Sequence, residues 1–146
     1  ETDVEMHRKT WFRTGDCFRI DPGGLLYYID RVADIIRHKG NKISCSEIEA
    51  VLQEHPAVTA ACVVEEPDPQ EGERIKAIVV LKEGVSGVDS TELTRWCQER
   101  IQLYSAPHYV EIRDTLPRSK VGKLLRREIR EKEKRKVEKT QTKVER

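Results

Sequence analysis

The 146-residue sequence lacks a long hydrophobic run. Its longest, residues 57–64, spans eight residues and includes a threonine, whereas a membrane-spanning helix needs about 18. No secretory or transit-peptide pattern opens the chain, which begins at Glu1 rather than Met. We therefore expect a cytoplasmic protein without a membrane span, and a piece of a longer chain.

Cysteine and histidine are few and scattered. The four cysteines stand at positions 17, 45, 62 and 97, with no Cys-x-x-Cys pair, and no histidine falls at ligand spacing from them. We therefore predict no metal site. Cys62 and Cys97 occupy apolar positions of periodic segments, which favours buried free thiols in a reducing compartment over a disulfide.

Charge, in contrast, is abundant and unevenly distributed. The 27 Lys and Arg residues nearly balance the 26 Asp and Glu residues, for a net charge of +1. Residues 126–146 alone carry +5, which leaves −4 on the remainder. Leu, Ile, Val and Phe make up about 25% of the chain, above the ~20% below which highly charged sequences stay disordered. The sequence therefore predicts a small core with a charged tail.

Period-two patterns and turn residues predict the strands. Two β-prone runs, 17–21 and 25–30, flank Pro22-Gly23-Gly24 and predict a hairpin. Further strands are expected at 58–64, 74–82 and 109–113. The second of these has apolar residues on both faces, which predicts a central position in its sheet. The intervening segment 65–72, with two prolines and a glycine, predicts a loop.

Two helices are expected before the tail. A capping box at Ser44–Glu47 or at Ser46–Glu49 begins the first, and the sequence leaves the register open. Asp89 or Ser90 caps the second. Its buried stripe is predicted to comprise Leu93, Trp96, Cys97 and Ile101.

A final helix is expected to open at Lys123 and to continue into the tail, 131–146, as an extended helix or a disordered segment. The order of elements predicts an α+β fold, in which a β-hairpin precedes a roughly three-stranded mixed sheet packed with helices.

Three polar stretches contain the residues best suited to chemistry. In the first, Asp16 follows a glycine turn, where a carboxylate can accept two hydrogen bonds from a vicinal diol such as a ribose. The second, Asp30–Glu49, crowds charges around Gly40. The third, 116–123, gathers cations at an expected helix start, which favours anions. Taken singly, they are better explained as a turn, a solvated charged surface and a basic helix end.

In their order and spacing, the three stretches resemble the C-terminal part of the adenylate-forming superfamily, which includes acyl-CoA synthetases. The resemblance covers about Trp11 to Arg127 and rests on Arg13-Thr14-Gly15-Asp16, Asp30-Arg31, Lys39-Gly40, Ser46-Glu47-Ile48-Glu49, Gly72-Glu73, Leu116-Pro117-Arg118-Ser119, Gly122-Lys123 and Arg126. It implies that a carboxylate attacks the α-phosphate of ATP to give acyl-adenylate and pyrophosphate. A thiol, usually that of CoA, then displaces AMP.

The resemblance also implies roles for individual residues. Asp16 would hold the ribose hydroxyls, and Arg31 would lie near the same nucleotide. Lys123 would be the catalytic residue, reaching between the substrate carboxylate and the phosphate, where an ammonium can stabilise developing charge. ATP and CoA would be substrates, and Mg²⁺ is expected with ATP but bound outside this chain.

The family alternates between two orientations of its small domain. By resemblance, residues 1–31 would end a large N-terminal domain, 32–34 would form the hinge, with Ala33 and Asp34 at its centre, and 35–130 would be the mobile domain. One orientation would bring Lys123 to the nucleotide. The other would bring Arg37, Lys39 and Gly40 to the thiol channel.

The sequence departs from the family pattern at three positions. Ala33 stands where the hinge residue is commonly Asp or Lys, and Arg37 stands where some relatives have a Lys that assists the second half-reaction. Cys45 replaces a proline at the start of a helix. Ala33 does not prevent a backbone hinge, but it removes a side chain that could lock either orientation.

The leading hypothesis is the C-terminal piece of an ATP-dependent acyl-CoA synthetase of fatty acid metabolism, inactive alone. Its partners would be the large N-terminal domain and a small carboxylic acid. One alternative is a ligase that passes the acyl group to a carrier-protein thiol. Another is a nucleic-acid-binding module that uses the basic tail, but 126–146 lacks aromatic residues and interleaves its cations with acids, so no nucleic-acid partner is expected.

Overall fold

A three-stranded sheet forms the centre of the protein in the computed structural model, which describes residues 3–6, 9–68, 70 and 72–144. Its strands are β7 (Val58–Asp68), β8 (Gly72–Leu81) and β9 (Tyr109–Ile112). The order is β7-β8-β9, with β7 antiparallel and β9 parallel to the central β8. The mixed sheet and the central position of β8 confirm the predicted α+β class.

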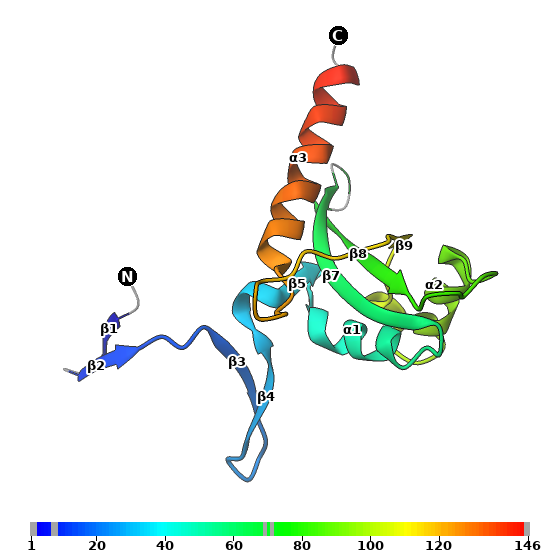
Figure 1. Ribbon diagram of the computed structural model, residues 1–146. Helices are drawn as coiled ribbons and strands as arrows, with labels where there is room; N and C mark the ends of the chain where they lie inside the picture. The colour runs from blue at the N-terminus through cyan, green and yellow to red at the C-terminus, as the bar shows by residue number, and fades with distance from the viewer. Residues whose placement is uncertain (1–2, 7–8, 69, 71, 145–146) are drawn as a thin grey trace.

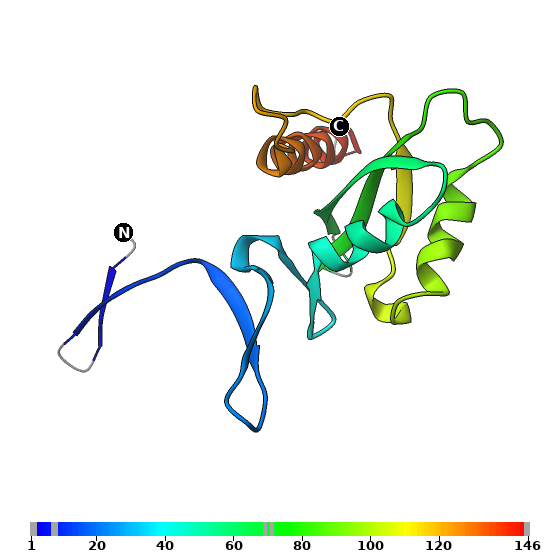
Figure 2. The same cartoon turned by 60° about the horizontal axis from the view of Figure 1, so that its bottom comes forward.

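Helices cover both faces of this sheet (Figures 1 and 2). One face packs against α1 (Cys45–Gln53) and α2 (Ser90–Gln98), and its core includes Ile48, Leu52, Ile75, Val79 and Leu93. The other face packs against α3 (Arg126–Val144), and its smaller core includes Cys62, Val64, Ile78 and Ile129. The two-sided apolar pattern of β8 therefore reflects two separate cores.

The long hairpin of β7 and β8 corrects the loop predicted at 65–72. The two strands stay paired from Val58↔Leu81 as far as Asp68↔Gly72. Pro67 is tolerated because β7 is an edge strand, where one side of the backbone needs no ladder partner. Acidic residues of this segment face cations, as Asp68 does at 2.8 Å from Arg74.

Two strands and a cap position the first helix. Strands β5 (Ile35–His38) and β6 (Asn41–Ser44) form a hairpin whose two-residue turn, Lys39-Gly40, has positive φ values of 47° and 81°. Such a turn matches the twist of paired strands and favours glycine. The Ser44 hydroxyl accepts the Glu47 amide at 3.2 Å, so Ser44 is the N-cap and the open register is settled.

The second helix is capped by Asp89, whose carboxylate accepts the Glu92 amide at 2.8 Å. Leu93 and Cys97 are fully buried, as predicted. Trp96 is only partly buried, because its indole N–H donates to the Val51 carbonyl while Arg100 covers its ring from the solvent side.

The third helix begins at Arg126, so the prediction that Lys123 opens it was wrong. Lys123 instead closes a tight loop, in which its amide donates to the Ser119 hydroxyl at 3.1 Å and its carbonyl accepts the Ser119 amide at 2.8 Å. The tail is helical as far as Val144, which confirms the extended helix rather than the disordered segment. No helix in the described ranges is both long and apolar enough to cross a bilayer.

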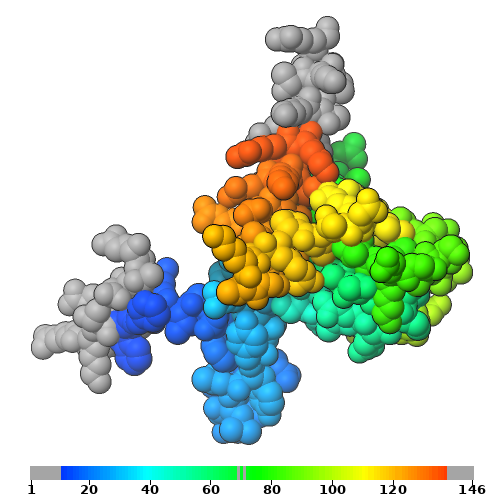
Figure 3. Space-filling view, viewed as in Figure 1, coloured from blue at the N-terminus to red at the C-terminus, as the bar shows by residue number. Residues whose placement is uncertain are grey.

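The N-terminal part stands away from this body. Strands β1 (Asp3–Met6) and β2 (Lys9–Phe12) pair with each other, and the hairpin of β3 (Asp16–Ile20) and β4 (Leu26–Arg31) projects as a separate lobe (Figure 3). The predicted hairpin is thus confirmed. It joins the sheet body through a short 3-10 helix, η1 (Val32–Asp34).

All four cysteines are free thiols, and three of them are buried. Burial raises the pKa of Cys62 to about 12 and that of Cys97 to about 11, and it also raises the pKa of Cys45. Cys17, on the projecting hairpin, is the more accessible thiol.

Candidate functional site

The structure brings Asp16 and Arg31 together at the base of the hairpin. The two residues are cross-strand partners in β3 and β4, and their side chains approach to 3.9 Å between Arg31 Nε and Asp16 Oδ1. The Arg31 side chain is 65% exposed, so most of its guanidinium remains available to a ligand. A carboxylate and a guanidinium side by side can contact the hydroxyls and the phosphate of one nucleotide.

Lys123 borders the same region. A surface hollow of about 560 Å³ lies between the hairpin base, η1 and the start of α3. Its lining residues are Tyr28, Asp30, Arg31, Ala33, Asp34, Ser46, Lys123, Leu124, Leu125, Arg126, Arg127 and Arg130. The hollow therefore places Lys123, Arg31 and both predicted hinge residues around one space, with four further cationic or acidic side chains.

Lys39 lies elsewhere, at the tip of the β5–β6 hairpin. It borders a second hollow, of about 520 Å³, together with His38, Asn41, Gln98, Leu103, Tyr104, Ala106, Pro107 and His108. Gly40 shares its turn, and Arg37 is exposed on β5. Of the predicted site residues, Arg31, Ala33, Asp34 and Lys123 thus line the first hollow, and Lys39 lines the second.

Asp30 is a buried carboxylate at the end of β4, only 2% exposed. Its Oδ2 accepts the Ser44 hydroxyl at 2.7 Å and the Ser46 amide at 3.0 Å, and its Oδ1 accepts the Arg31 amide at 2.8 Å. Burial alone would raise the pKa of Asp30, but these hydrogen bonds outweigh it and hold the pKa below the usual 3.8. The ionised carboxylate therefore joins the hairpin to the first turn of α1.

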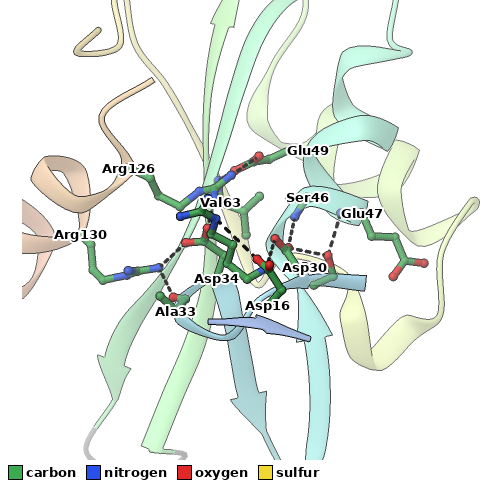
Figure 4. A network of polar contacts seen from close by, with 12 residues as sticks. Asp16, Asp30, Ala33, Asp34, Ser46, Glu47, Glu49, Val63, Arg126 and Arg130 are labelled. Carbon is green, nitrogen blue, oxygen red and sulfur yellow. Dashed lines mark hydrogen bonds and ion pairs between the residues drawn. The ribbon is translucent and has the colours of Figure 1, made fainter. Parts of the chain in front are cut away.

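Arg126, in the first turn of α3, bridges two acidic residues from distant parts of the chain (Figure 4). It lies 2.7 Å from Asp34 and 2.5 Å from Glu49. The other Glu49 oxygen accepts the Val63 amide at 2.7 Å. Burial raises the pKa of Glu49 even though Val63 and Arg126 both oppose the shift. Arg126 thus neutralises a carboxylate that is otherwise costly to bury.

Arg130, one helical turn after Arg126, binds both the main chain and the side chain of the Ala33–Asp34 segment. Its guanidinium donates to the Ala33 carbonyl at 2.8 Å and to Asp34 at 3.2 Å. It also donates to Glu65 at 2.8 Å. The last helix, the edge strand β7 and the predicted hinge are therefore linked through one side chain.

A second charge network fastens α3 to the sheet farther along. The Lys76 ammonium lies 2.6 Å from Glu133 and 2.8 Å from Glu111, and Arg113 lies 2.6 Å from Glu133. Glu133 is fully buried. The hydrogen bond from Arg113 is the main cause that lowers the pKa of Glu111, to about 2, with Lys76 acting in the same direction against partial burial.

Sequence reasoning missed the roles of Arg126 and Arg130. It counted Arg126 among the cations near the basic loop and among the residues of the family resemblance, and Arg130 only within the charge of the tail, and it gave neither of them a partner. One signal was present: the two arginines are four residues apart, on one helix face, in a segment whose charge is opposite to that of the body. The acidic partners at 34, 49 and 65 could not be predicted from the sequence, because they come together only in the folded chain.

Comparison with known proteins identifies the family. Residues 47–123 match the family described as the AMP-binding enzyme C-terminal domain. A feruloyl-CoA synthase from an Amycolatopsis species is 38% identical over 89% of this chain, and the crotonobetaine/carnitine–CoA ligase of Escherichia coli is 36% identical over 82%. This chain spans 26% and 23% of these two proteins, about a quarter of their length.

A solved structure agrees with these matches. The o-succinylbenzoate CoA synthetase of Bacillus subtilis, in complex with its acyl-adenylate intermediate, superposes with a TM-score of 0.70 at 39% identity, over 82% of this chain and 24% of that one. The chain therefore belongs to the AMP-binding enzyme C-terminal domain family, and its relatives are CoA synthetases and ligases. In the described residues, no group of three or more His, Cys, Asp or Glu side chains is placed to hold a metal ion.

Proposed function

We propose that this chain is the C-terminal part of an ATP-dependent acyl-CoA synthetase of the cytoplasm. The enzyme would convert a carboxylic acid and ATP to acyl-adenylate and pyrophosphate, and then form a thioester with CoA and release AMP. The large domain that carries the acyl pocket would come from the N-terminal side, and Mg²⁺ would be bound outside these residues. We expect the 146-residue chain alone to be inactive.

The observation that carries this proposal is that Lys123 and Lys39 lie on two different hollows. Lys123 and Arg31 border one hollow, whereas Lys39 borders the other. Two hollows on one small domain suit a reaction with two chemically different steps. The likeness to CoA ligases supports the same assignment.

In the first step, Asp16 and Arg31 would position the nucleotide, and Lys123 would approach the site where the carboxylate meets the α-phosphate. Two anions converge there, so a positive charge lowers the barrier to attack. In the second step, the 32–34 segment would turn the domain, and the β5–β6 hairpin with Arg37, Lys39 and Gly40 would face the thiol.

The test uses full-length enzyme and measures the two half-reactions separately. Lys123→Ala should slow acyl-adenylate formation by about 10²- to 10³-fold, the usual effect of removing one transition-state contact. Thioester formation from supplied acyl-adenylate should change by less than about threefold. Lys120→Ala, in the same exposed loop, is the matched control and should affect neither step. Equal losses in both steps would contradict the role given to Lys123.

A reciprocal variant tests the second hollow. Lys39→Ala keeps a side chain at a residue with positive φ, so the backbone strain is unchanged while the charge is lost. It should raise the KM for CoA and leave acyl-adenylate formation intact. Parallel assays with CoA and with a carrier protein identify which thiol accepts the acyl group. A Lys39→Ala enzyme that loses adenylation instead would show that the two hollows do not serve different steps.

A further inference from the structure

The β5–β6 hairpin, which carries Lys39 and Gly40 at its tip, is fixed to the core at its base. Ile36 and Ile43 are cross-strand partners in this hairpin, and both are buried in the core that α1 and α2 cover. Closer to the tip, His38 shares the face of Ile36, because alternate residues of a strand point to the same side. His38 is only 4% exposed, whereas Lys39 and Gly40 are exposed. A buried imidazole therefore lies directly beneath an exposed turn.

The His38 imidazole binds the main chain of the central strand. Its Nδ1 lies 2.6 Å from the carbonyl oxygen of Glu73, which is 35 residues away in the sequence. A carbonyl oxygen only accepts hydrogen bonds, so Nδ1 carries the proton and donates it. Strand β9 pairs with β8 from Lys76 onward, so Glu73 lies ahead of that pairing. The imidazole thus supplies a donor where β9 has not yet begun.

His108 occupies the next position along the same edge of β8. Its amide donates to the Ile75 carbonyl at 2.9 Å, and its Nδ1 accepts the Ile75 amide at 3.1 Å. Ile75 and Glu73 are two residues apart, so their main-chain groups point to the same edge of the strand. The rings of His38 and His108 meet edge to face, with their centroids 4.7 Å apart. His38 is therefore joined to the sheet by a hydrogen bond and by a ring contact.

This pair of imidazoles lies at the second hollow. His38, Lys39 and His108 all line the hollow of about 520 Å³. The group that fixes the turn and the cation on the turn thus border the same space. A change in the contacts of His38 would move Lys39 and Gly40 relative to that hollow without removing either residue.

We propose that His38 is a positioning residue for thioester formation, which holds the turn of Lys39 and Gly40 at the second hollow through Glu73 and His108. This inference rests on the proposed function, which assigns that hollow to the thiol. A turn that is in place for only part of the time lowers the apparent affinity for CoA in the same proportion, and saturating CoA restores the ordered turn. Loss of the anchor should therefore raise the KM for CoA and leave kcat nearly unchanged.

Three substitutions separate the parts of the imidazole. His38→Phe keeps a ring beside His108 and removes the donor. His38→Asn keeps a donor in the position of Nδ1, because its amide nitrogen is the same number of bonds from Cα. His38→Gln places its amide nitrogen in the position of Nε2 instead. Lys42→Gln is the matched control, because Lys42 is exposed on the opposite face of the same hairpin.

The assay uses full-length enzyme and measures thioester formation from supplied acyl-adenylate against CoA concentration. His38→Phe should raise the KM for CoA about tenfold, the effect of one hydrogen bond, and should change kcat by less than about threefold. His38→Asn should keep the KM within about threefold of the parent enzyme, and His38→Gln should resemble His38→Phe. Acyl-adenylate formation should change by less than about twofold in every variant, and Lys42→Gln should alter neither step.

Two kinetic results would overturn the proposal. One is a parent-like KM in His38→Phe. The other is recovery in His38→Gln but not in His38→Asn, because the imidazole would then act through Nε2 and not through the Glu73 carbonyl. The comparison of His38→Asn with His38→Gln decides the point even where His38→Phe does not fold.

Amide hydrogen exchange in the same enzymes tests the anchor without CoA. Peptides that cover 38–43 should exchange about tenfold faster in His38→Phe than in His38→Asn, while β7 and β8 stay protected. Unchanged exchange in these peptides would overturn the anchor. Loss of protection throughout β7 and β8 in His38→Asn and His38→Gln alike would also overturn it, because the imidazole would then be needed for folding. Faster exchange at the tip in an enzyme that forms no thioester would contradict the proposed function and leave the anchor standing.

Discussion

Arg126 offers a direct test of how the last helix is held to the rest of the domain. Arg126→Met removes the guanidinium from between Asp34 and Glu49 and keeps a flexible apolar stem. Its neighbour supplies the matched control. Arg127 is on the same turn, but its side chain is 89% exposed and pairs with Glu131, at 3.0 Å.

The size of the effect follows from burial. Removing one partner of a buried ion pair typically costs about 3–5 kcal/mol of unfolding free energy. Asp34 keeps Arg130, and Glu49 can take up a proton, so we expect about 2–4 kcal/mol for Arg126→Met. An exposed i,i+4 pair contributes about 0.3–0.5 kcal/mol, which sets the expectation for Arg127→Met.

Urea unfolding measures both variants. With a slope of about 2 kcal/mol/M, the midpoint of Arg126→Met should fall by about 1–2 M and that of Arg127→Met by less than about 0.3 M. Burial already raises the pKa of Glu49 above its unfolded value, and removing Arg126 should raise it further. The folded state then binds protons more readily than the unfolded state. The loss of unfolding free energy caused by Arg126→Met should therefore be smaller at pH 5 than at pH 8.

Two results would refute this reasoning. Equal midpoints for the two variants would show that the contacts of Arg126 contribute no more than a surface pair. A deficit that grows as the pH falls to 5 would show that Glu49 is not the carboxylate left uncompensated.

Three further predictions concern stability. Glu133→Gln should cost about 2–3 kcal/mol by thermal melting, because this fully buried carboxylate faces Lys76 and Arg113, while the exposed Glu131→Gln should cost less than about 0.5; similar losses would contradict the network. The pKa of Glu111 is lowered to about 2, so its contribution to the unfolding free energy is complete above its unfolded pKa. That contribution, roughly 1–2 kcal/mol after allowing for the partial exposure of Glu111, should be lost as the pH falls from about 4.5 to 2. Glu111→Gln should flatten this dependence of stability on pH. Gly40→Ala should cost about 1 kcal/mol in unfolding free energy, because φ is +81° but an added Cβ meets nothing within 4 Å; a loss above about 3 would point to a steric cause.

Local signals were sufficient for elements that depend on neighbouring residues. The Pro22-Gly23-Gly24 turn identified the hairpin, and the two-sided apolar pattern of residues 74–82 identified the central strand. Both signals act within ten residues, and the structure confirms both. The capping box stayed ambiguous because both serines had a glutamate three residues later, and only the fold selects Ser44.

Contacts that hydrophobic periodicity does not report account for the errors. Glu65 looked like the start of a loop, yet it lies in β7 because Arg130 and Lys134 of the last helix neutralise it. Lys123 looked like a helix start, yet Ser119 closes a loop around it and delays the helix by three residues. In each case the deciding partner lies elsewhere in the chain or in backbone geometry that hydrophobic periodicity does not report.

The buried thiols have a chemical consequence for the proposed reaction. An acyl-adenylate is a mixed anhydride that acylates thiolates, and any reactive cysteine on the moving domain would compete with CoA for the acyl group. Two properties make Cys45, Cys62 and Cys97 unreactive toward the acyl group. They are buried, and their raised pKa values keep them protonated. The domain could thus lie close to the acyl-adenylate without being acylated by it.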